Sequence, residues 1–356
     1  MDSHTQAVSV VLKLADHPVI PFPQLSETEA EGRLGNDYAD FIAIIAKADH
    51  RFHAVDFRAA AAFYRAAVRL VDQKGATSAG MLRDVRRAQT MIIWFDQLFK
   101  DHLLGSLDKA GFTKPNRHPR FQKSLEIMLS ERERPPVFHR FPQTPLVYFY
   151  PDLPHVEFVD VSEYAWCDAF EAGFPAMRQE ALKLLGGRDH FKPYIRANTQ
   201  RPQGDVHGML ENADWSTYFL WENGGAVVDN VVACPQTAQA TMDVAPLCHM
   251  GPRAPSVMLS LLRPGAHIPP HTGMLNCRYI CHLPLVIPEN CGFRVGETTI
   301  EWREGQMIAF DDTVQHEAWN RSDNNRVLLI FDIWRPELEL AEREMITALF
   351  AAVDSY

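Results

Sequence analysis

Two histidines near the ends of apolar runs are the residues of this chain with the clearest potential for metal chemistry. His271 follows two prolines and precedes Thr-Gly, which places it at the mouth of a strand rather than inside one. His316 comes just after the run MIAFDD and is expected at the end of another strand. Two neutral imidazoles from neighbouring strand ends of a barrel can hold an iron ion while coordination positions stay open. The pair therefore predicts an iron centre.

An arginine adds an anion-binding group to this pair. Arg326 lies ten residues after His316 and begins the apolar run RVLLIF. A guanidinium deep in a barrel needs an anionic partner, and a carboxylate can accept two parallel hydrogen bonds from it. A dicarboxylate that binds the metal at one end and the arginine at the other fits both features.

The sequence around these residues predicts short strands, which must position them. Beyond about Trp215 the sequence consists of short apolar runs separated by Gly, Pro, Asn and Asp. The runs are WSTYFLW, SVMLSLL, CRYICHLPLVI, GFRVG, TTIEW, MIAF and RVLLIFDIW. Many short strands without intervening helices indicate an antiparallel jelly roll of the double-stranded β-helix (cupin-like) type rather than a doubly wound sheet.

The N-terminal third has a different pattern of apolar and polar residues, so we expect an α+β chain in three parts. Residues 1–36 carry a Pro-rich patch and an acidic run and are expected to form a loosely docked arm. Residues 37–125 place apolar residues at three- and four-residue spacing, which predicts helices with one TPR-like hairpin. A stable repeat array needs about three units, so a small helical bundle is favoured. Residues 126–356 are assigned to the jelly-roll domain, with one long helix over 160–186.

Composition narrows the class of protein. The chain has 356 residues, 46% of them hydrophobic, which is enough for a sizeable core. Its formal charge of −10 argues against a general nucleic-acid binder. The six cysteines form no CxxC pair, the N-terminus lacks signal-peptide features, and no apolar stretch approaches the ~18 residues of a membrane span. We expect a cytoplasmic protein without a membrane span that acts on a peptide, protein or small molecule.

Several segments resemble the aspartyl/asparaginyl β-hydroxylase family of iron(II)- and 2-oxoglutarate-dependent oxygenases. The resemblance is carried by PHTGMLNCR (270–278), HLPLVIP (282–288), FDDTVQHEAWN (310–320) and R…DIWRPEL (326–338). Weaker matches are FHRFPQTPLVYFYPDLP (138–154) and CPQT (234–237). The similarity covers roughly residues 137–338, and its order and spacing make it specific.

The resemblance implies roles for particular residues. His271 and His316 match the two iron-ligand histidines of the family. Arg326 matches the arginine that pairs with the far carboxylate of 2-oxoglutarate, and Ser260 matches a serine that assists it. His282 matches a histidine near the metal-side carboxylate. With O2 as the third reactant, the implied reaction is hydroxylation of an unactivated carbon, with 2-oxoglutarate converted to succinate.

The substrate implied by the family is the β-carbon of an Asp or Asn residue in a peptide or protein, with a free amino acid or a lipid acyl chain as the alternatives. Arg278 matches an arginine of the substrate pocket. Ile280 stands where the family commonly has a second arginine, and on a strand it faces the same way as Arg278 and His282. This exchange removes one cation from the pocket wall.

A missing carboxylate is a second feature of the predicted site. Most oxygenases of this chemistry use two histidines and one acid, with the acid two residues after the first histidine. That position is Gly273 here, a gap that the family resemblance predicts. Asp312, four residues before His316, is the candidate for a carboxylate that holds a water molecule in this place. Direct binding of Asp312 to iron is the alternative, and an open position could also accept a halide.

Two other interpretations are weighed against this one. Cys277, Cys281 and His282 suggest zinc, but on a strand the cysteines face away from the histidine and no fourth ligand is evident. The alternative from another class is a non-catalytic helical scaffold with a degenerate β-sandwich, which predicts no binding of iron or 2-oxoglutarate.

Overall fold

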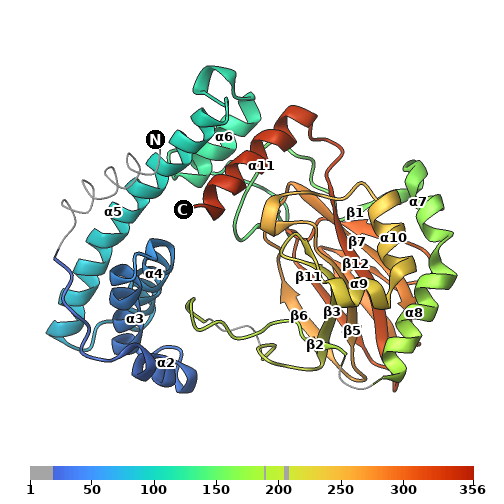
Figure 1. The fold of residues 1–356 in the computed structure, drawn as a ribbon, viewed down its shortest axis with the longest axis horizontal. Helices are drawn as coiled ribbons and strands as arrows, with labels where there is room; N and C mark the ends of the chain where they lie inside the picture. The colour runs from blue at the N-terminus through green and yellow to red at the C-terminus, as the bar shows by residue number, and fades with distance from the viewer. Residues whose placement is uncertain (1–18, 188–189, 204–207) are drawn as a thin grey trace. The chain divides into compact units, whose positions relative to one another are not determined.

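The chain forms two compact units (Figure 1). The computed structural model describes residues 19–187, 190–203 and 208–356. One unit comprises Met1–Leu104, Ala197–Val206 and Tyr356, and the other comprises Gly105–Arg196 and His207–Ser355.

The first unit is built from helices. They are α2 (Glu27–Asn36), α3 (Phe41–His53), α4 (Phe57–Lys74) and the first part of α5 (Ala79–Lys109). Asp40 and Asp56 cap α3 and α4, because their side chains accept hydrogen bonds from backbone N–H groups three residues on. Fully buried alanines such as Ala60 and Ala67 allow these helices to pack closely. The predicted helical character of this region is confirmed.

Helix α2 differs from the expected loose arm. Ser26 and Glu29 form a capping box at its N-terminus. Lys47, fully buried on α3, lies 2.8 Å from Glu27 and 2.7 Å from Glu31. A buried ammonium needs anionic partners, so α2 is held in place. Residues 1–18 of the expected arm lie outside the described residues.

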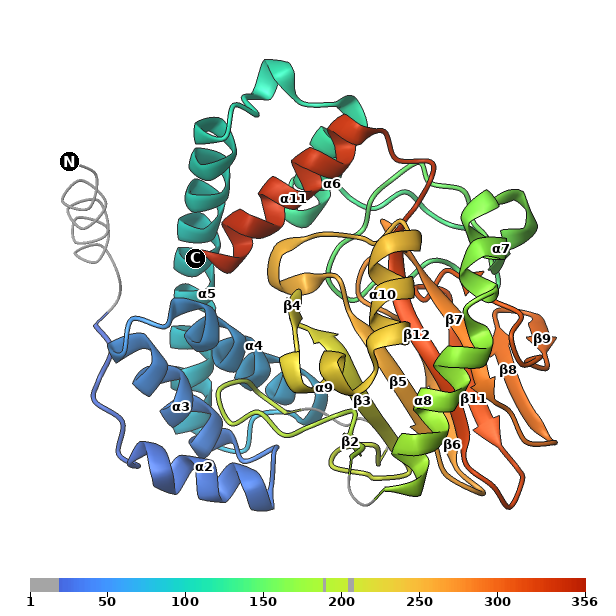
Figure 2. The ribbon, with the colours of Figure 1, turned by 45° about the vertical axis from the view of Figure 1, so that its right-hand side comes forward.

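The second unit contains two antiparallel sheets, which confirms the predicted jelly roll. The larger sheet has the order β1-β10-β7-β12-β5-β3-β2, with β4 beside β3, and the smaller has the order β6-β11-β8-β9. Figure 2 shows the smaller sheet beside the larger one. The strands are β1 (Phe158–Val159), β2 (Lys192–Pro193), β3 (Trp215–Glu222), β4 (Gly225–Ala226), β5 (Val257–Leu262), β6 (His267–His271), β7 (Arg278–Val286), β8 (Cys291–Val295), β9 (Thr298–Ile300), β10 (Ile308–Phe310), β11 (His316–Asn320) and β12 (Arg326–Trp334).

The two faces of the larger sheet have different partners. Leu329 and Phe331 of β12 point outward into an apolar core with α7 (Ala165–Glu171), α8 (Phe174–Gly186) and α10 (Pro235–Val244). Alternate residues such as Leu328 point inward and pack against the smaller sheet. Arg326 shares the inward parity of Leu328, so the register directs its side chain into the barrel.

One predicted helix is two helices. The expected helix over 160–186 breaks between α7 and α8 at Gly173. Pro175 is in the first turn of α8, where its missing N–H costs nothing, but a helix interior would not accept it. The chain therefore restarts the helix at Phe174.

The remaining helices include η1 (Lys114–Asn116), α6 (Pro119–Met128), η2 (Val161–Glu163), α9 (Val228–Ala233), η3 (Gly251–Arg253) and α11 (Leu340–Asp354). Helix α6 lies in the range predicted as helical, yet it belongs to the second unit, where Arg120 lies 2.6 Å from Glu342 of α11. Among the described helices, none combines the length and apolar character required to cross a bilayer.

Candidate oxygenase site

His271 and His316 lie side by side inside the second unit. They are the last residue of β6 and the first residue of β11, and they are paired in the antiparallel register of these strands. Their ring centroids are 4.1 Å apart. His316 was expected to end the strand that holds MIAF; instead a turn after β10 carries the chain to the smaller sheet, and His316 begins a new strand.

Both rings are held in the same tautomer. Nδ1 of His271 lies 2.8 Å from the carbonyl of Pro269, and Nδ1 of His316 lies 3.0 Å from the carbonyl of Val314. A carbonyl only accepts, so each Nδ1 carries the proton and each Nε2 keeps its lone pair. Burial lowers the pKa of His316 to about 3, so this imidazole is neutral at physiological pH. Two neutral imidazoles fixed in this way are suited to divalent iron.

Arg326 is a buried cation without an anion. Its side chain is fully buried, and neither Nε nor Nη2 has a hydrogen-bond partner. No ion pair to Arg326 occurs within residues 19–187, 190–203 and 208–356. Burial lowers its pKa to about 10, which still leaves it charged at neutral pH. A charge in this position is costly unless a ligand supplies the counter-charge.

Ser260 and His282 lie on the same inner face as Arg326. Ser260 accepts a hydrogen bond of 3.3 Å from Nε1 of Trp215, and Nδ1 of His282 is buried without a partner. Burial and the nearby Arg326 guanidinium hold the pKa of His282 well below its usual value. The ring of Phe310 connects the sheets, with its centroid 4.9 Å from His282 and 5.3 Å from His316. The barrel interior thus joins the histidine pair to the predicted 2-oxoglutarate residues.

Asp312 fills the space beside Gly273. A Cβ atom on Gly273 would lie 2.0 Å from Oδ2 of Asp312, and the Gly273 N–H donates to the Asp312 carbonyl at 2.6 Å. Oδ1 of Asp312 is buried without a hydrogen-bond partner. Its carboxyl group therefore fills the space that a side chain at position 273, where most related sites carry their acid, would have to enter. This supports the predicted role of Asp312 in holding a water molecule near the metal.

The titration of Asp312 gives a test of this role. Burial, opposed by Arg278, raises its pKa to about 7, so the carboxyl is neutral below this pH and negative above it. In the wild type we expect affinity for iron(II) to rise by about tenfold as pH increases through 7, because the negative charge favours the cation. In Asp312→Asn this part of the rise is lost. Anaerobic iron titrations of both proteins measure the difference, and equal pH profiles would rule the role out.

Arg278 is already paired. Its Nη1 lies 2.9 Å from Asp332 and its Nη2 lies 3.8 Å from Asp312. Ile280, two residues on, packs with the apolar interior of the barrel. The predicted cation of the substrate pocket is present, but two carboxylates surround it and its neighbour on the strand is apolar.

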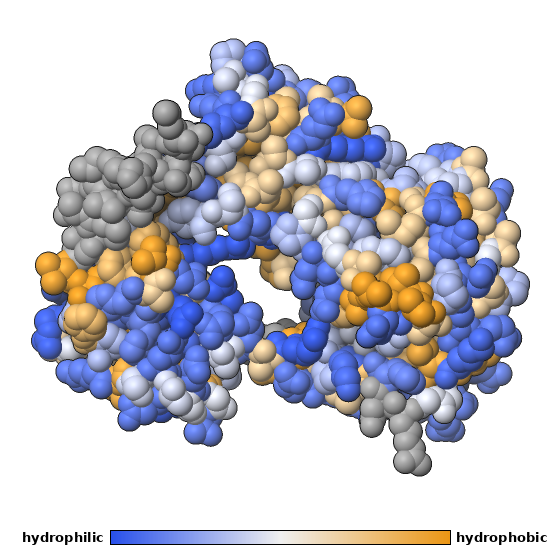
Figure 3. All heavy atoms as spheres, in the orientation of Figure 1, coloured by the Kyte–Doolittle hydropathy of each residue, from blue (hydrophilic) through white to orange (hydrophobic). Residues whose placement is uncertain are grey.

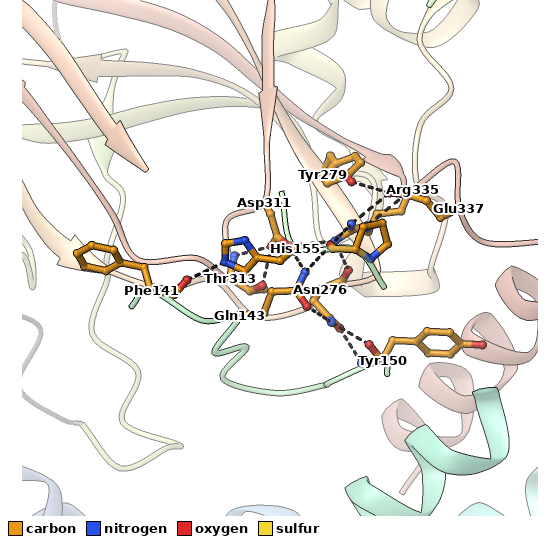
Figure 4. Close-up of polar contacts among 11 residues, drawn as sticks. Phe141, Gln143, Tyr150, His155, Asn276, Tyr279, Asp311, Thr313, Arg335 and Glu337 are labelled. Atoms are coloured by element: carbon orange, nitrogen blue, oxygen red, sulfur yellow. Dashed lines mark hydrogen bonds and ion pairs between the residues drawn. The ribbon is translucent and has the colours of Figure 1, made fainter. Parts of the chain in front are cut away.

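A buried polar network supports the turn that carries Asp312 (Figure 4). Asp311 accepts hydrogen bonds from the N–H and hydroxyl of Thr313 and from the amide of Gln143. Arg335 lies 2.9 Å from Asp311 and donates at 2.8 Å to the carbonyl of Pro154. The turn between β10 and β11 is therefore fixed from the side opposite to the barrel interior.

Sequence reasoning missed two aromatic residues of the site. The Trp215 ring lies 5.9 Å from His271, and the Tyr194 ring lies 4.3 Å from Trp215. Trp215 begins the predicted strand WSTYFLW, which placed it correctly on a strand but gave no sign that it reaches the histidine. Tyr194 follows the two-residue strand β2, which no pattern indicated.

The zinc interpretation finds no support in the geometry. Cys281 packs in the outer core, whereas His282 faces the barrel interior. All six cysteines are free and buried. In the described part of the chain no group of three His, Cys, Asp or Glu side chains is arranged to hold a metal. The candidate metal ligands are therefore the two histidines, with the remaining positions left to cosubstrate and water.

Several proteins are similar in sequence to this region of the chain. The chain is 32% identical over 180 residues to an ornithine lipid ester-linked acyl 2-hydroxylase of Rhizobium tropici, covering 50% of this chain and 60% of that protein. It is 36% identical over 142 residues to the aspartyl/asparaginyl beta-hydroxylase of Mus musculus, covering 40% of this chain and 19% of that protein. It is 30% identical over 214 residues to aspartate beta-hydroxylase domain-containing protein 2 of Xenopus tropicalis, covering 59% and 55%.

These matches span between 19% and 60% of the relatives' own lengths. Residues 171–336 match the sequence profile of the aspartyl/asparaginyl beta-hydroxylase family. The matched range contains the histidine pair, Arg326 and the turn with Asp312. Residues 171–336 are therefore similar in sequence to the aspartyl/asparaginyl β-hydroxylase family.

Proposed function

We propose that the second unit is an iron(II)- and 2-oxoglutarate-dependent oxygenase that hydroxylates an unactivated carbon. This proposal depends on one observation. Two adjacent imidazoles have Nε2 lone pairs that could bind a metal, and the same barrel contains the buried guanidinium of Arg326, whose Nε and Nη2 have no hydrogen-bond partner. A dicarboxylate cosubstrate satisfies both groups at once. A degenerate scaffold has no reason to bury an uncompensated charge.

The residues of the site have separate tasks. His271 and His316 would hold iron(II) through Nε2. Arg326, with Ser260 beside it on the inner face, would bind the distal carboxylate of 2-oxoglutarate, and His282 would meet the metal-side carboxylate. When bound, iron(II), 2-oxoglutarate and O2 supply the oxidising chemistry, in which one oxygen atom enters the substrate and the other enters succinate, with release of CO2. The aromatic barrel interior excludes water from this centre.

The family resemblance and the relatives together give three candidate substrate classes. The family resemblance favours the β-carbon of an Asp or Asn residue in a peptide or protein. The relative from Rhizobium tropici is named for an ester-linked acyl chain, and a free amino acid is the third class. The six free, buried thiols agree with a reducing compartment, and we propose action in the cytoplasm.

The proposed function is tested by the visible charge-transfer band expected when iron(II) and 2-oxoglutarate are added without oxygen. The wild type is expected to show the band, and His271→Ala is expected to lack it because one of only two protein ligands is gone. His267→Ala is the matched control. His267 is on the same strand, but its half-exposed ring pairs with Glu317 away from the site. A wild type without the band, or a band that persists in His271→Ala, contradicts the proposal.

Arg326→Met separates cosubstrate binding from iron binding. Methionine fills similar volume without the charge, so we expect the KM for 2-oxoglutarate to rise by about a hundredfold or more. The protein without cosubstrate is expected to unfold at the same or a higher temperature, because an uncompensated buried charge is removed. Succinate release and thermal unfolding measure the two effects, with Arg321→Met as the control because Arg321 is exposed over Trp319. An unchanged KM would assign the cosubstrate carboxylate to another residue.

A further inference from the structure

The indole of Trp215 contacts both halves of the proposed site. Trp215 is the first residue of β3, and it is only partly buried. Its ring centroid lies 5.9 Å from that of His271, on the metal side. Its Nε1 lies 3.3 Å from the hydroxyl oxygen of Ser260, the residue assigned to the distal carboxylate. One side chain therefore lies between a metal ligand and a cosubstrate residue.

The register of the larger sheet places Trp215 and Arg326 on either side of the strand that carries Ser260. Leu262 of β5 is paired with Trp215 of β3 and with Arg326 of β12. Ser260 lies two residues before Leu262, so both side chains point to the same, inner face of the sheet. Residues that are diagonal across adjacent strands are within reach of long side chains. Ser260 is thus within reach of the indole from one neighbouring strand and of the guanidinium from the other.

The direction of the hydrogen bond between Trp215 and Ser260 follows from the chemistry of the two groups. An indole N–H only donates, so the Ser260 oxygen accepts in this contact. A hydroxyl carries one proton, and this proton must then point away from the indole. Within residues 19–187, 190–203 and 208–356, the protein itself supplies no acceptor for that proton. The indole therefore turns the Ser260 hydroxyl proton away from β3, the strand opposite to that of Arg326.

We propose that Trp215 is a positioning residue for the cosubstrate, because its N–H holds the Ser260 hydroxyl so that the O–H donates to the distal carboxylate of 2-oxoglutarate beside Arg326. This inference rests on the proposed function. Hydrogen bonds to an ionised acceptor are shorter and stronger than those between neutral groups, so a fixed donor direction favours the diacid. Arg326 does not depend on Trp215, because its guanidinium lies 5.0 Å from the ring centroid of Trp302.

The test compares 2-oxoglutarate with 2-oxopentanoate, which has the same carbon chain and the same metal-binding end but no distal carboxylate. Each compound is titrated without oxygen into the full chain loaded with iron(II), and the charge-transfer band gives its Kd. The Kd of 2-oxopentanoate divided by that of 2-oxoglutarate is called the carboxylate ratio, because it reports binding of the distal carboxylate alone. A general loss of iron or of folded protein affects both titrations equally and leaves this ratio unchanged.

Two substitutions remove the partners of the hydrogen bond one at a time. Trp215→Phe keeps a ring beside His271 and removes the N–H donor. We expect the Kd of 2-oxoglutarate to rise by about tenfold, and that of 2-oxopentanoate to stay within about twofold of the wild type. Ser260→Ala is expected to lower the carboxylate ratio by a similar factor. The double variant is expected to lower it no further than the larger single change, because the two residues act through one hydrogen bond.

Two controls carry changes elsewhere in the same unit. Trp221→Phe is the same substitution on the same strand, but the Trp221 ring packs in the outer core with the helices. Val232→Ala alters a residue that is 73% exposed on α9, where Figure 3 shows a hydrophobic patch. Both variants are expected to keep the carboxylate ratio of the wild type.

The outcomes separate this inference from the proposed function. A band in the wild type together with an unchanged carboxylate ratio in Trp215→Phe overturns the positioning role and leaves the oxygenase intact. An unchanged ratio in Ser260→Ala overturns the positioning role as well, even where Trp215→Phe does not fold. A double variant whose ratio falls by the product of the two single changes, about a hundredfold, shows independent action and also overturns it. Absence of the band in the wild type with either compound overturns the oxygenase, and this inference with it.

Discussion

Replacing Arg335 by methionine is expected to lower the free energy of unfolding by about 3–5 kcal/mol, because it leaves a buried carboxylate without its cation. Arg335 and Asp311 are both fully buried and lie 2.9 Å apart. The same guanidinium donates to the Pro154 carbonyl and lies 4.3 Å from the ring centroid of Tyr279.

The loss is expected to depend on pH. Burial raises the pKa of Asp311 even with Arg335 in place. Without the guanidinium this pKa rises further, so the folded protein takes up a proton more readily. The sign follows from linkage: a raised carboxyl pKa contributes stability that is lost as pH rises through the folded value. The Arg335→Met protein should therefore be damaged more at alkaline pH than at acidic pH.

Two controls make the measurement decisive. Lys123→Met removes an exposed ion pair of similar length, 2.7 Å from Asp152, and is expected to cost less than about 1 kcal/mol. The double variant Arg335→Met with Asp311→Asn is expected to lose less than the sum of the single losses, because the buried charge is gone. Denaturant unfolding of the wild type, Arg335→Met, Asp311→Asn, the double variant and Lys123→Met gives the values. A loss for Arg335→Met no larger than that for Lys123→Met would show that the network is not a stabilising feature.

The network also explains how the fold serves the site. Asp311 is followed directly by Asp312, so the contacts that hold Asp311 from outside fix the direction in which Asp312 points. Asp311 caps the turn, because it accepts a hydrogen bond from the Thr313 N–H, whereas Oδ1 of Asp312 has no hydrogen-bond partner. The adjacent carboxylates thus divide a structural task and a proposed functional one.

Much of the barrel was predictable because its strands are buried. The run at β12 is almost wholly apolar because its residues face either the helices or the barrel. The alternation of side chains along β7 correctly placed Cys281 and His282 on opposite faces of the sheet. The histidine pair and Arg326 were recognisable because they interrupt apolar patterning at strand ends, where packing alone gives no reason for them.

Other features depend on tertiary contacts that no local pattern encodes. Strand β6 contains Pro269 and Pro270, which usually argue against a strand, but it is the edge of the smaller sheet, where a missing N–H is tolerated. The Leu146 N–H donates to the Gly273 carbonyl, although the two residues are more than a hundred positions apart in the sequence. The contact of Asp312 with Gly273 likewise exists only because two turns of the barrel meet.

The contact between Asp312 and Gly273 predicts a large effect of the substitution Gly273→Asp on stability and iron(II) affinity. Gly273→Asp should not simply complete a two-histidine, one-carboxylate site. The new side chain would enter space that the Asp312 carboxyl group already fills, with its Cβ atom 2.0 Å from Oδ2. We expect a loss of about 1–3 kcal/mol in unfolding free energy from overpacking, increased by the contact of two buried carboxyl groups. Iron(II) affinity is expected to fall as well, because the turn that positions His316 must move.

Removing the Asp312 side chain should reverse the sign of the effect that Gly273→Asp has on stability and on iron(II) affinity. In an Asp312→Ala background the space beside Gly273 is empty, so Gly273→Asp is expected to restore stability and to raise iron(II) affinity above that of Asp312→Ala alone. Gly273→Ala in both backgrounds separates the steric effect from the charge. Unfolding curves and anaerobic iron titrations of this set measure the coupling between the two positions. If Gly273→Asp has the same effect with and without Asp312, the Asp312 carboxyl group does not compete for the space beside Gly273, because only competition for one space makes the two changes non-additive.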